Sequence, residues 1–182
     1  MSSAPSKLVI LDRDGVINFD SDAYIRTPDE WRPIPGSLEA IATLGAHDFA
    51  VVVLSNQSGI GRGLFSEETL EAIHSKMRES VARAGGALSG IYYCPHRPEE
   101  ACHCRKPAPG LLEQIAADFG RSLTGTPVIG DKLTDVQAAL AVDARPILVR
   151  TGHGEATAAK LGNLGIEIYA DLAEAAARLV AE

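Results

Sequence analysis

The feature that most constrains the fold of this 182-residue chain is a regular alternation of short apolar runs with helix-like segments. Runs rich in β-branched or aliphatic residues occupy positions 8–11, 50–54, 91–93, 127–129 and 146–149, and such runs are typical of buried parallel strands. Between them, positions 37–44, 66–84, 110–119 and 134–142 carry apolar residues at spacings of three and four, which predicts crossover helices. The pattern therefore predicts an α/β doubly wound fold, with a mainly parallel sheet and helices on both faces.

The helix expected over 66–84 shows a clear start signal. Ser66 is a good N-cap, and Glu67 and Glu68 stand in the first turn, where the helix dipole favours acids. The tail from 152 to 182 predicts a further helix, a short edge strand at 167–169 and a closing helix. Without a repeat, a linker or an insertion large enough for a cap domain, we expect one domain over residues 1–182, with an open site.

Charge and hydropathy narrow the classes of partner. The net charge is −7, so an anionic substrate must be attracted by a local cluster of positive groups or by a metal, and nucleic acid is not expected. No apolar stretch approaches the roughly 20 residues of a spanning helix, and the first residues lack the pattern of a secretory signal. We therefore expect a cytoplasmic protein with no membrane partner, and a monomer.

Acidic residues follow two of the expected strands at the point where each strand ends. Asp12 and Asp14 come directly after the run at 8–11, and Asp131 follows the run at 127–129. In a doubly wound fold the binding site lies at these strand ends, so the carboxylates should meet there. Carboxylates are typical Mg²⁺ ligands. Asp-x-Asp-Gly can also be an ordinary exposed turn, but its repetition at a second strand end favours a magnesium site.

Two further residues complete a possible phosphate site. Ser55, expected to close the strand at 50–54, begins a polar loop whose hydroxyl and N–H donors suit phosphate oxygens, although the same residues are common in turns. Lys106 supplies the positive charge that the acidic strand ends lack, although a lysine beside a proline is also common on solvated surface.

All three cysteines lie within eleven residues, in a segment that also contains a histidine. Cys94 and His96 form one pair and Cys102 and Cys104 another, each with one intervening residue. Three thiolates and one imidazole suit a closed tetrahedral Zn²⁺ site with a structural role. The alternative is a set of reduced buried cysteines beside an incidental histidine. The spacing favours a zinc loop over residues 94–107, which would hold Arg105 and Lys106 toward the phosphate site.

Together these segments resemble the four ordered motifs of the haloacid dehalogenase superfamily. The motifs are Asp12-Arg13-Asp14-Gly15-Val16, Ser55, Lys106 and the segment 130–135. Within the superfamily, residues 12–18, 55–59, 94–96 and 102–107 resemble the D-glycero-D-manno-heptose 1,7-bisphosphate 7-phosphatases, which are relatives of histidinol phosphatase. The resemblance implies a haloacid dehalogenase-like fold and a bacterial phosphatase of heptose nucleotide and lipopolysaccharide core synthesis, acting on a small phosphorylated sugar.

The resemblance also implies a role for each motif residue. Asp12 would be the nucleophile that forms an aspartyl phosphate, and Asp14 the general acid and base. Mg²⁺ would be held by the Asp12 carboxylate, the Asp14 backbone carbonyl and the Asp131 carboxylate. Ser55 and Lys106 would bind the other phosphoryl oxygens.

Several assignments stay open on the sequence alone. Asp135 could orient Lys132 or the metal waters, or only start a helix. Arg105 could hold the distal phosphate of a bisphosphate, and the further substrate contacts that we expect are Asn18, Asn56, Gln57, Arg62 and Lys132. His47, His74 and His153 show no partner and are assigned to the surface or to helices. The alternatives in function are a histidinol-phosphate phosphatase and, more distantly, a non-catalytic zinc-containing binding module.

Overall fold

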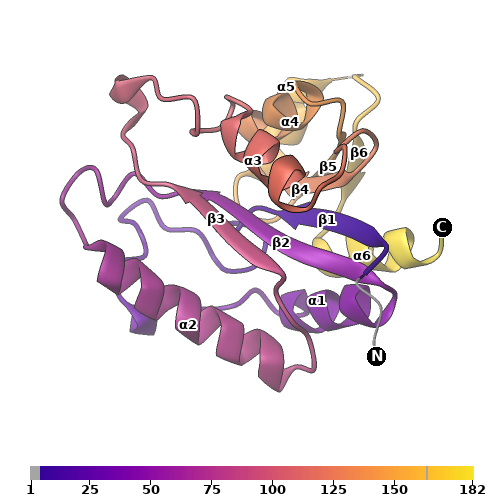
Figure 1. Cartoon of the computed structure of the whole chain (residues 1–182), viewed down its shortest axis with the longest axis horizontal. Coiled ribbons are helices and arrows are strands. Elements are labelled where there is room, and N and C mark those ends of the chain that lie inside the picture. Colours follow the sequence, from indigo (N-terminus) through magenta and orange to yellow (C-terminus); the bar gives the residue numbers. More distant parts are fainter. Residues whose placement is uncertain (1–4, 163) are drawn as a thin grey trace.

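The computed structural model describes residues 5–162 and 164–182. Across these residues six parallel strands form one sheet in the order β3-β2-β1-β4-β5-β6 (Figure 1). The strands are β1 (Lys7–Leu11), β2 (Phe49–Asn56), β3 (Gly90–Cys94), β4 (Pro127–Gly130), β5 (Arg145–Val149) and β6 (Glu167–Tyr169). The order reverses at β1 and β4, so a doubly wound α/β fold is confirmed, and the site is expected where those two strands end.

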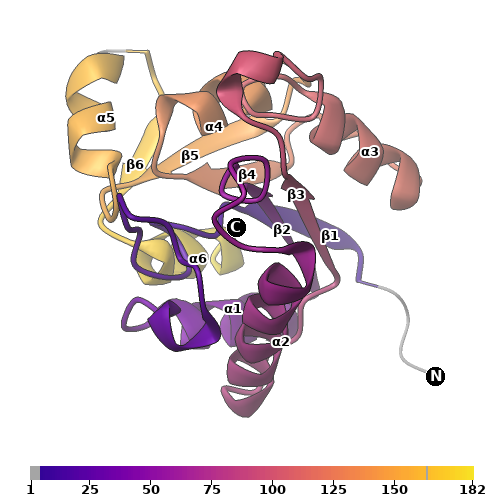
Figure 2. The same cartoon turned by 90° about the vertical axis from the view of Figure 1, so that its left-hand side faces the viewer.

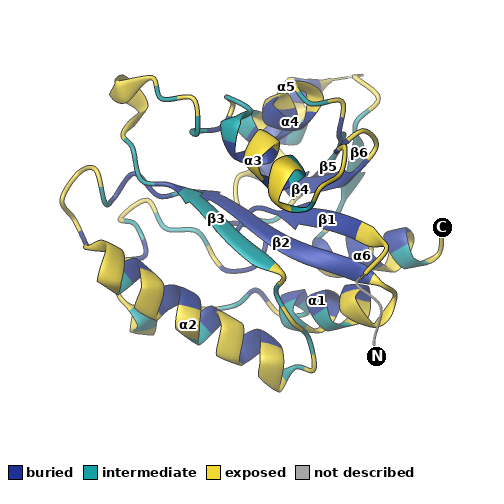
Figure 3. Ribbon diagram, viewed as in Figure 1, coloured by how far each residue is buried: buried dark blue, intermediate teal, exposed yellow. Residues whose placement is uncertain are grey.

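Helices cover both faces of this sheet. They are α1 (Ser37–Ala46), α2 (Glu67–Arg83), α3 (Gly110–Asp118), α4 (Leu133–Leu140), α5 (Gly154–Leu161) and α6 (Leu172–Val180). Side chains of α1, α2 and α6 pack with one set of strand residues, and side chains of α3 and α4 pack with the alternate set. The buried strands therefore lie between two layers of helices whose outer faces are exposed (Figure 3).

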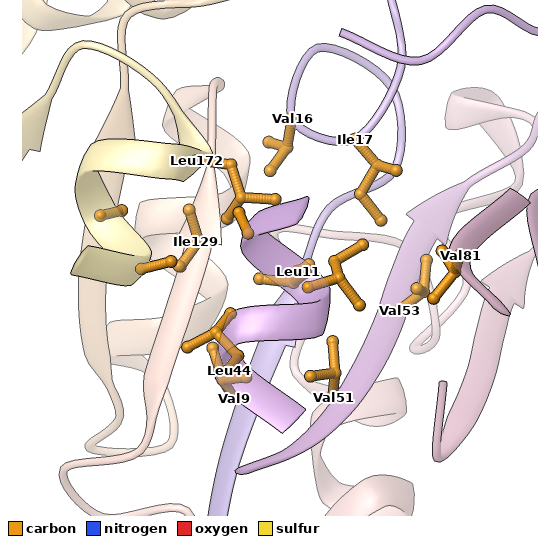
Figure 4. Close-up of a cluster of buried hydrophobic side chains, with 14 of the residues drawn as sticks. Val9, Leu11, Val16, Ile17, Leu44, Val51, Val53, Val81, Ile129 and Leu172 are labelled. Atoms are coloured by element: carbon orange, nitrogen blue, oxygen red, sulfur yellow. The ribbon is translucent and has the colours of Figure 1, made fainter. Parts of the chain in front are cut away.

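The larger core cluster fixes the central strands. Val9 and Leu11 of β1 face the same side as Val51 and Val53 of β2, and Leu44 of α1 packs against them (Figure 4). This alternation follows from the period of two in a strand. Because β1 and β2 are held in register from Lys7 opposite Phe49 to Leu11 opposite Val53, the residues that follow β1 have a fixed position.

One predicted strand boundary is wrong. The strand expected over 50–54 continues through Ser55 to Asn56, because these two residues pair with Tyr93 and Cys94 of β3. Backbone hydrogen bonds of the sheet thus extend the strand past the point where its side chains become polar. Ser55 lies within the strand and is fully buried rather than closing it.

The segment 12–36, which connects β1 to α1, is too short to form a cap domain. Among its residues the structure contains one short 3₁₀ helix, η1 (Pro28–Glu30), and isolated bridges that join Asn18 to Asp14 and to Pro33. The segment therefore forms a loop at the carboxyl ends of the strands, with no large cap. Across the described residues, no helix is long and apolar enough to span a membrane.

His74 is buried in α2, with its ring centroid 5.8 Å from that of Tyr93. Burial, with the nearby positive charges of Arg13 and Arg78, lowers the pKa of His74 to about 3. In the unfolded chain an imidazole has a pKa of about 6.5. The unfolded state therefore takes up a proton first as the pH falls, and this group destabilises the fold between about pH 6.5 and 3.

We predict that replacing His74 by glutamine flattens the loss of stability in mild acid. The wild-type protein loses up to about 1.4 kcal/mol per pH unit from this group below pH 6.5, whereas the His74→Gln variant has no such titration. Urea unfolding between pH 7.5 and 5 measures the difference in slope. Equal slopes for the two proteins would contradict the buried, neutral state of His74.

Candidate active site

The carboxyl ends of β1 and β4 bring two acidic segments together. Leu11 pairs with Ile129, and the next backbone N–H, of Asp12, donates to the Ile129 carbonyl at 2.8 Å. Asp131 follows β4 directly and is fully buried. Figure 2 views the sheet from this end, where the loops that follow β1, β2 and β3 gather. The parallel pairing of β1 with β4 thus brings Asp12 and Asp131 together.

Three buried carboxylates share a small volume at this point. Asp12, Asp131 and Asp135 each place one oxygen within 4.8 Å of the others. Lys106 Nζ lies 3.0 Å from Asp12 Oδ1 and 2.6 Å from Asp135 Oδ1. Burial raises the pKa of Asp12 to about 7 although Lys106 opposes it, and burial also raises the pKa of Asp131 to about 6. Lys132 Nζ lies 3.8 Å from Asp131 Oδ1, so two ammonium groups face three carboxylates, and the cluster suits an additional cation.

The geometry around Asp131 fits a metal ligand. Its Oδ2 accepts the His153 backbone N–H at 2.7 Å, whereas its Oδ1 is buried and accepts no hydrogen bond from any described residue. Gly15 and Gly152, both at positive φ, approach so closely that a Cβ at either position would collide with Asp131. The backbone therefore closes around one oriented carboxylate whose other oxygen is available to a hard cation such as Mg²⁺.

Ser55 and Lys106 lie at the same end of the sheet. Ser55 Oγ is buried and has no hydrogen-bond partner among the described residues. The side chain of Asn56 holds the backbone of Lys106 at two points, accepting from its N–H at 3.1 Å and donating to its carbonyl at 3.1 Å. Lys106 Nζ also donates to the Leu54 carbonyl at 3.0 Å. An ammonium is therefore held beside the carboxylates, and a buried hydroxyl without a partner lies at the same end of the sheet, and both groups suit the binding of phosphoryl oxygens.

Asp14 lies two residues after Asp12 in the sequence but in a different electrostatic environment. Its carboxylate accepts hydrogen bonds of 2.9 to 3.0 Å from the Arg13 guanidinium and from the side-chain amides of Asn18 and Gln57. Burial opposes its ionisation, but the Arg13 charge and these hydrogen bonds outweigh that effect and lower the pKa of Asp14. The two aspartates of one motif thus have opposite pKa shifts, a pattern that suits two different chemical roles.

A cleft of about 440 Å³ is lined by Lys106, which pairs with the buried Asp12 and Asp135. Its lining includes Asp14, Asn56, Gln57, Arg105 and Lys132, together with Asp20, Ser21, Tyr24 and Ile25 from the loop after β1. At the rim, Lys132 Nζ lies 2.7 Å from Asp20 Oδ2, and His153 Nε2 lies 3.3 Å from the same oxygen. The cleft therefore combines positive groups for a phosphorylated ligand with polar groups for its remainder.

The cysteine and histidine ligands also converge. The three sulfur atoms lie 3.3 to 3.5 Å apart, and His96 Nδ1 is 3.1 Å from Cys104 Sγ and 3.6 Å from Cys94 Sγ. Zn–S bonds of about 2.3 Å place tetrahedral ligands about 3.8 Å apart, so this arrangement is close to that of a metal site. Burial raises the pKa of Cys94 to about 12, which disfavours three neighbouring thiolates without a cation.

Comparisons with known proteins agree with this geometry. The model of polynucleotide kinase 3 phosphatases matches residues 7–133, and the HAD-hydrolase-like model matches residues 103–175. A D-glycero-beta-D-manno-heptose-1,7-bisphosphate 7-phosphatase of Pseudomonas putida is 52% identical over 174 residues, covering 96% of this chain and 99% of the relative. The enzyme of the same name from Bordetella bronchiseptica is 49% identical, covering 97% of this chain and 99% of its own.

The chain belongs to the haloacid dehalogenase-like family of heptose 1,7-bisphosphate 7-phosphatases.

Solved structures of this family have the same fold. The crystal structure of the Bordetella bronchiseptica phosphatase, complexed with magnesium and phosphate, superposes with a TM-score of 0.93 at 49% identity, covering 96% of this chain and 98% of that one. The Burkholderia thailandensis phosphatase gives a TM-score of 0.78 at 42% identity, covering 97% and 100%. A family member has therefore been seen with the ion and the anion that the carboxylates, Ser55 and Lys106 suit here.

The six expected substrate contacts lie in three kinds of place in the structure. Asn56, Gln57, Arg105 and Lys132 line the cleft, whereas Arg62 is exposed and pairs with Glu99 at 3.4 Å, outside the lining. Both polar atoms of the Gln57 side chain are already engaged, by Asp14 and Arg13. Asn18 is fully buried and donates to Asp14 and to the Phe19 carbonyl. These two amides therefore support Asp14 directly.

Asp135 makes two contacts at the start of α4. Its Oδ2 accepts the Lys132 backbone N–H at 2.9 Å, so it caps α4, and its Oδ1 pairs with Lys106. It thus orients Lys106, which the sequence did not suggest, and it lies within the carboxylate cluster. Sequence reasoning also missed Arg13, Asp20 and His153. Arg13 stands inside the first motif, but Asp20 and His153 come from loops without a periodic signal.

Proposed function

We propose that this protein removes the 7-phosphate of D-glycero-β-D-manno-heptose 1,7-bisphosphate. The observation that carries the proposal is the identity of about one half, over nearly the whole chain, with enzymes of that name. The cleft supports it, because Arg105 and Lys132 provide positive charge beyond the carboxylate cluster for a second phosphate. These relatives favour this substrate over histidinol phosphate, and the complete set of catalytic residue types favours an enzyme over a binding module.

The proposed reaction begins with Asp12. A carboxylate oxygen of Asp12 attacks the phosphorus of the 7-phosphate, and the bond between that phosphorus and the sugar oxygen on C7 breaks. Asp14 donates its proton to that leaving oxygen, which yields the sugar alcohol and an aspartyl phosphate. Asp14 then takes a proton from water as the water attacks phosphorus, and inorganic phosphate leaves Asp12. Asp12 lies inside the site, with its Oδ1 3.0 Å from Lys106 Nζ, whereas Asp14 lines the cleft where the leaving sugar would lie, which supports this division of roles.

The remaining groups bind charge in this proposal. The Asp12 and Asp131 carboxylates and the Asp14 backbone carbonyl hold Mg²⁺, which offsets charge on the transferring phosphoryl group when bound. Lys106 Nζ, next to Asp12, and the Ser55 hydroxyl bind the other phosphoryl oxygens. Asp135 keeps Lys106 in place. Asp12 would thereby meet an oriented phosphoryl group with little reorganisation of the site.

We further propose that the Cys94, His96, Cys102 and Cys104 site holds Zn²⁺ with a structural role. The four ligands leave no open position for chemistry. Arg105 and Lys106 follow Cys104 directly, so the metal fixes the segment that carries two cations of the cleft. A cytoplasmic location belongs to this proposal because the cluster needs reduced thiols. The pathway would be the synthesis of heptose nucleotides for lipopolysaccharide.

We predict that purified protein with Mg²⁺ releases phosphate from the heptose 1,7-bisphosphate with a kcat/KM at least about 100-fold higher than for histidinol phosphate, since a cleft built for two phosphates loses charged contacts with a single one. A phosphate-release assay of both bisphosphate anomers, the heptose 7-phosphate and histidinol phosphate measures this ratio. Preference for histidinol phosphate would assign the other substrate, and no release from any would favour a binding module.

We predict that loss of the zinc site lowers thermal stability and weakens substrate binding together. The Cys102→Ser variant should lose at least about 5 °C in Tm and show a raised KM, because Arg105 and Lys106 lose their support. His103→Gln is the matched control, since His103 lies in the same loop but is exposed and pairs with Glu113. Bound zinc is measured in parallel. A zinc-free variant with unchanged Tm and KM would refute the role.

A further inference from the structure

Arg13 is a cation placed inside the protein, with an exposed fraction of 0%. Its Nε and Nη2 donate to Asp14 Oδ1 at 3.0 and 2.9 Å, and Nη2 also lies 3.0 Å from Asp14 Oδ2. Nη2 further contacts Gln57 Oε1 at 3.2 Å. Asp14 is the single carboxylate paired with Arg13 among the described residues. The guanidinium therefore pairs with the Asp14 carboxylate, which lines the cleft, through two of its nitrogens.

Gln57 forms the second arm of this arrangement. Its Nε2 donates to Asp14 Oδ2 at 2.9 Å while its Oε1 accepts from Arg13. Its backbone N–H donates to the carbonyl of Cys94 at 2.7 Å, so the residue is fixed to the end of β3 at the first ligand of the cysteine cluster. We call Arg13 and Gln57, with the Asp14 carboxylate between them, the Asp14 clamp.

The turn after β1 does not need the Arg13 side chain to stay closed. Backbone hydrogen bonds run from Gly15 N–H to the Asn18 carbonyl at 2.7 Å and from Ile17 N–H to the Arg13 carbonyl at 2.9 Å. A buried guanidinium is costly to desolvate, and a shorter apolar side chain would fill an interior position at less cost. The retained cation therefore points to a task at Asp14 rather than in the turn.

We propose that Arg13 and Gln57 are positioning residues that hold the Asp14 carboxyl group in one orientation, toward the leaving oxygen. The inference rests on the proposed function, in which Asp14 is the proton donor. Three N–H groups, of Arg13 and Gln57, fix both oxygens of Asp14 and leave the side chain one orientation. The same orientation serves both proton transfers, from Asp14 to the sugar oxygen and later from the attacking water to Asp14.

Leaving-group dependence tests this role. A sugar alkoxide must be protonated as it departs, whereas nitrophenolate departs as a stable anion. The ratio kcat/KM covers the steps through phosphoryl transfer to Asp12 and excludes the later hydrolysis. General acid catalysis contributes about 10²- to 10⁴-fold, so Arg13→Met and Gln57→Met should lower kcat/KM about 10- to 100-fold for the heptose bisphosphate and less than about threefold for p-nitrophenyl phosphate.

Matched variants separate positioning from loss of stability. Arg145 also binds carboxylates with its guanidinium, those of Glu167 and Glu182, but it begins β5 at the opposite end of the sheet. The Arg145→Met variant should lose stability without changing the ratio of alkyl to aryl activity. Arg13 is buried, so the Arg13→Met variant can fail to fold. In that case the Gln57→Met variant tests the positioning role, because it keeps both charges of the clamp. Arg13→Lys should behave like Arg13→Met, since an ammonium does not form the same bidentate contact.

The outcomes distinguish the clamp from the proposed function. In an Asp14→Asn background, Gln57→Met should cause no further change in the alkyl-to-aryl ratio. Equal losses for both substrates in the single clamp variants would overturn the inference and leave a structural role. If Asp14→Asn itself leaves the ratio unchanged, the proposed proton donor is wrong. Inactivity of the wild type toward the heptose bisphosphate would remove that substrate alone, and histidinol phosphate would then serve as the alkyl substrate.

Discussion

The ion pairs of Lys106 with Asp12 and Asp135 are the contacts on which the rest of the site depends. Three carboxylates meet where β1 and β4 end, and the Lys106 ammonium offsets part of their charge from inside the protein. Lys106 lies 94 positions after Asp12 in the chain, so Asn56 of β2 must hold its backbone. The sheet, the polar end of β2 and the cysteine loop therefore together place the Lys106 ammonium against the carboxylates of Asp12 and Asp135.

Much of this arrangement could be predicted from the sequence because it follows from periodic structure. The apolar runs before Asp12 and Asp131 identify two parallel strands, and parallel strands end at the same edge of a sheet, so the carboxylates had to meet. The paired spacing of Cys94 with His96 likewise brings two ligands together without reference to the fold. Where local spacing or sheet geometry fixes a position, few residues suffice for a correct prediction.

The residues that could not be predicted lie in loops or in side-chain networks. Asp20 meets Lys132 across 112 positions, and both come from turns whose paths have no repeating pattern. Ser55 was misplaced because pairing with β3 extends the strand beyond its apolar run. His74 has an ordinary helical position, and only packing against Tyr93 shows that it is buried and neutral. In each case a long-range contact determines what local sequence leaves open.

In the proposed reaction, Asp12 carries the phosphoryl group during turnover. Mass spectrometry of acid-quenched protein measures it most directly, with the Asp14→Asn enzyme as the background in which slower hydrolysis prolongs the intermediate. After reaction with p-nitrophenyl phosphate and Mg²⁺, since nitrophenolate departs without an acid, we predict one added phosphoryl group on the peptide that contains Asp12, and none when Asp12→Asn is combined with it. A phosphoryl group on another residue, or substantial turnover by the purified Asp12→Asn protein, would contradict the account.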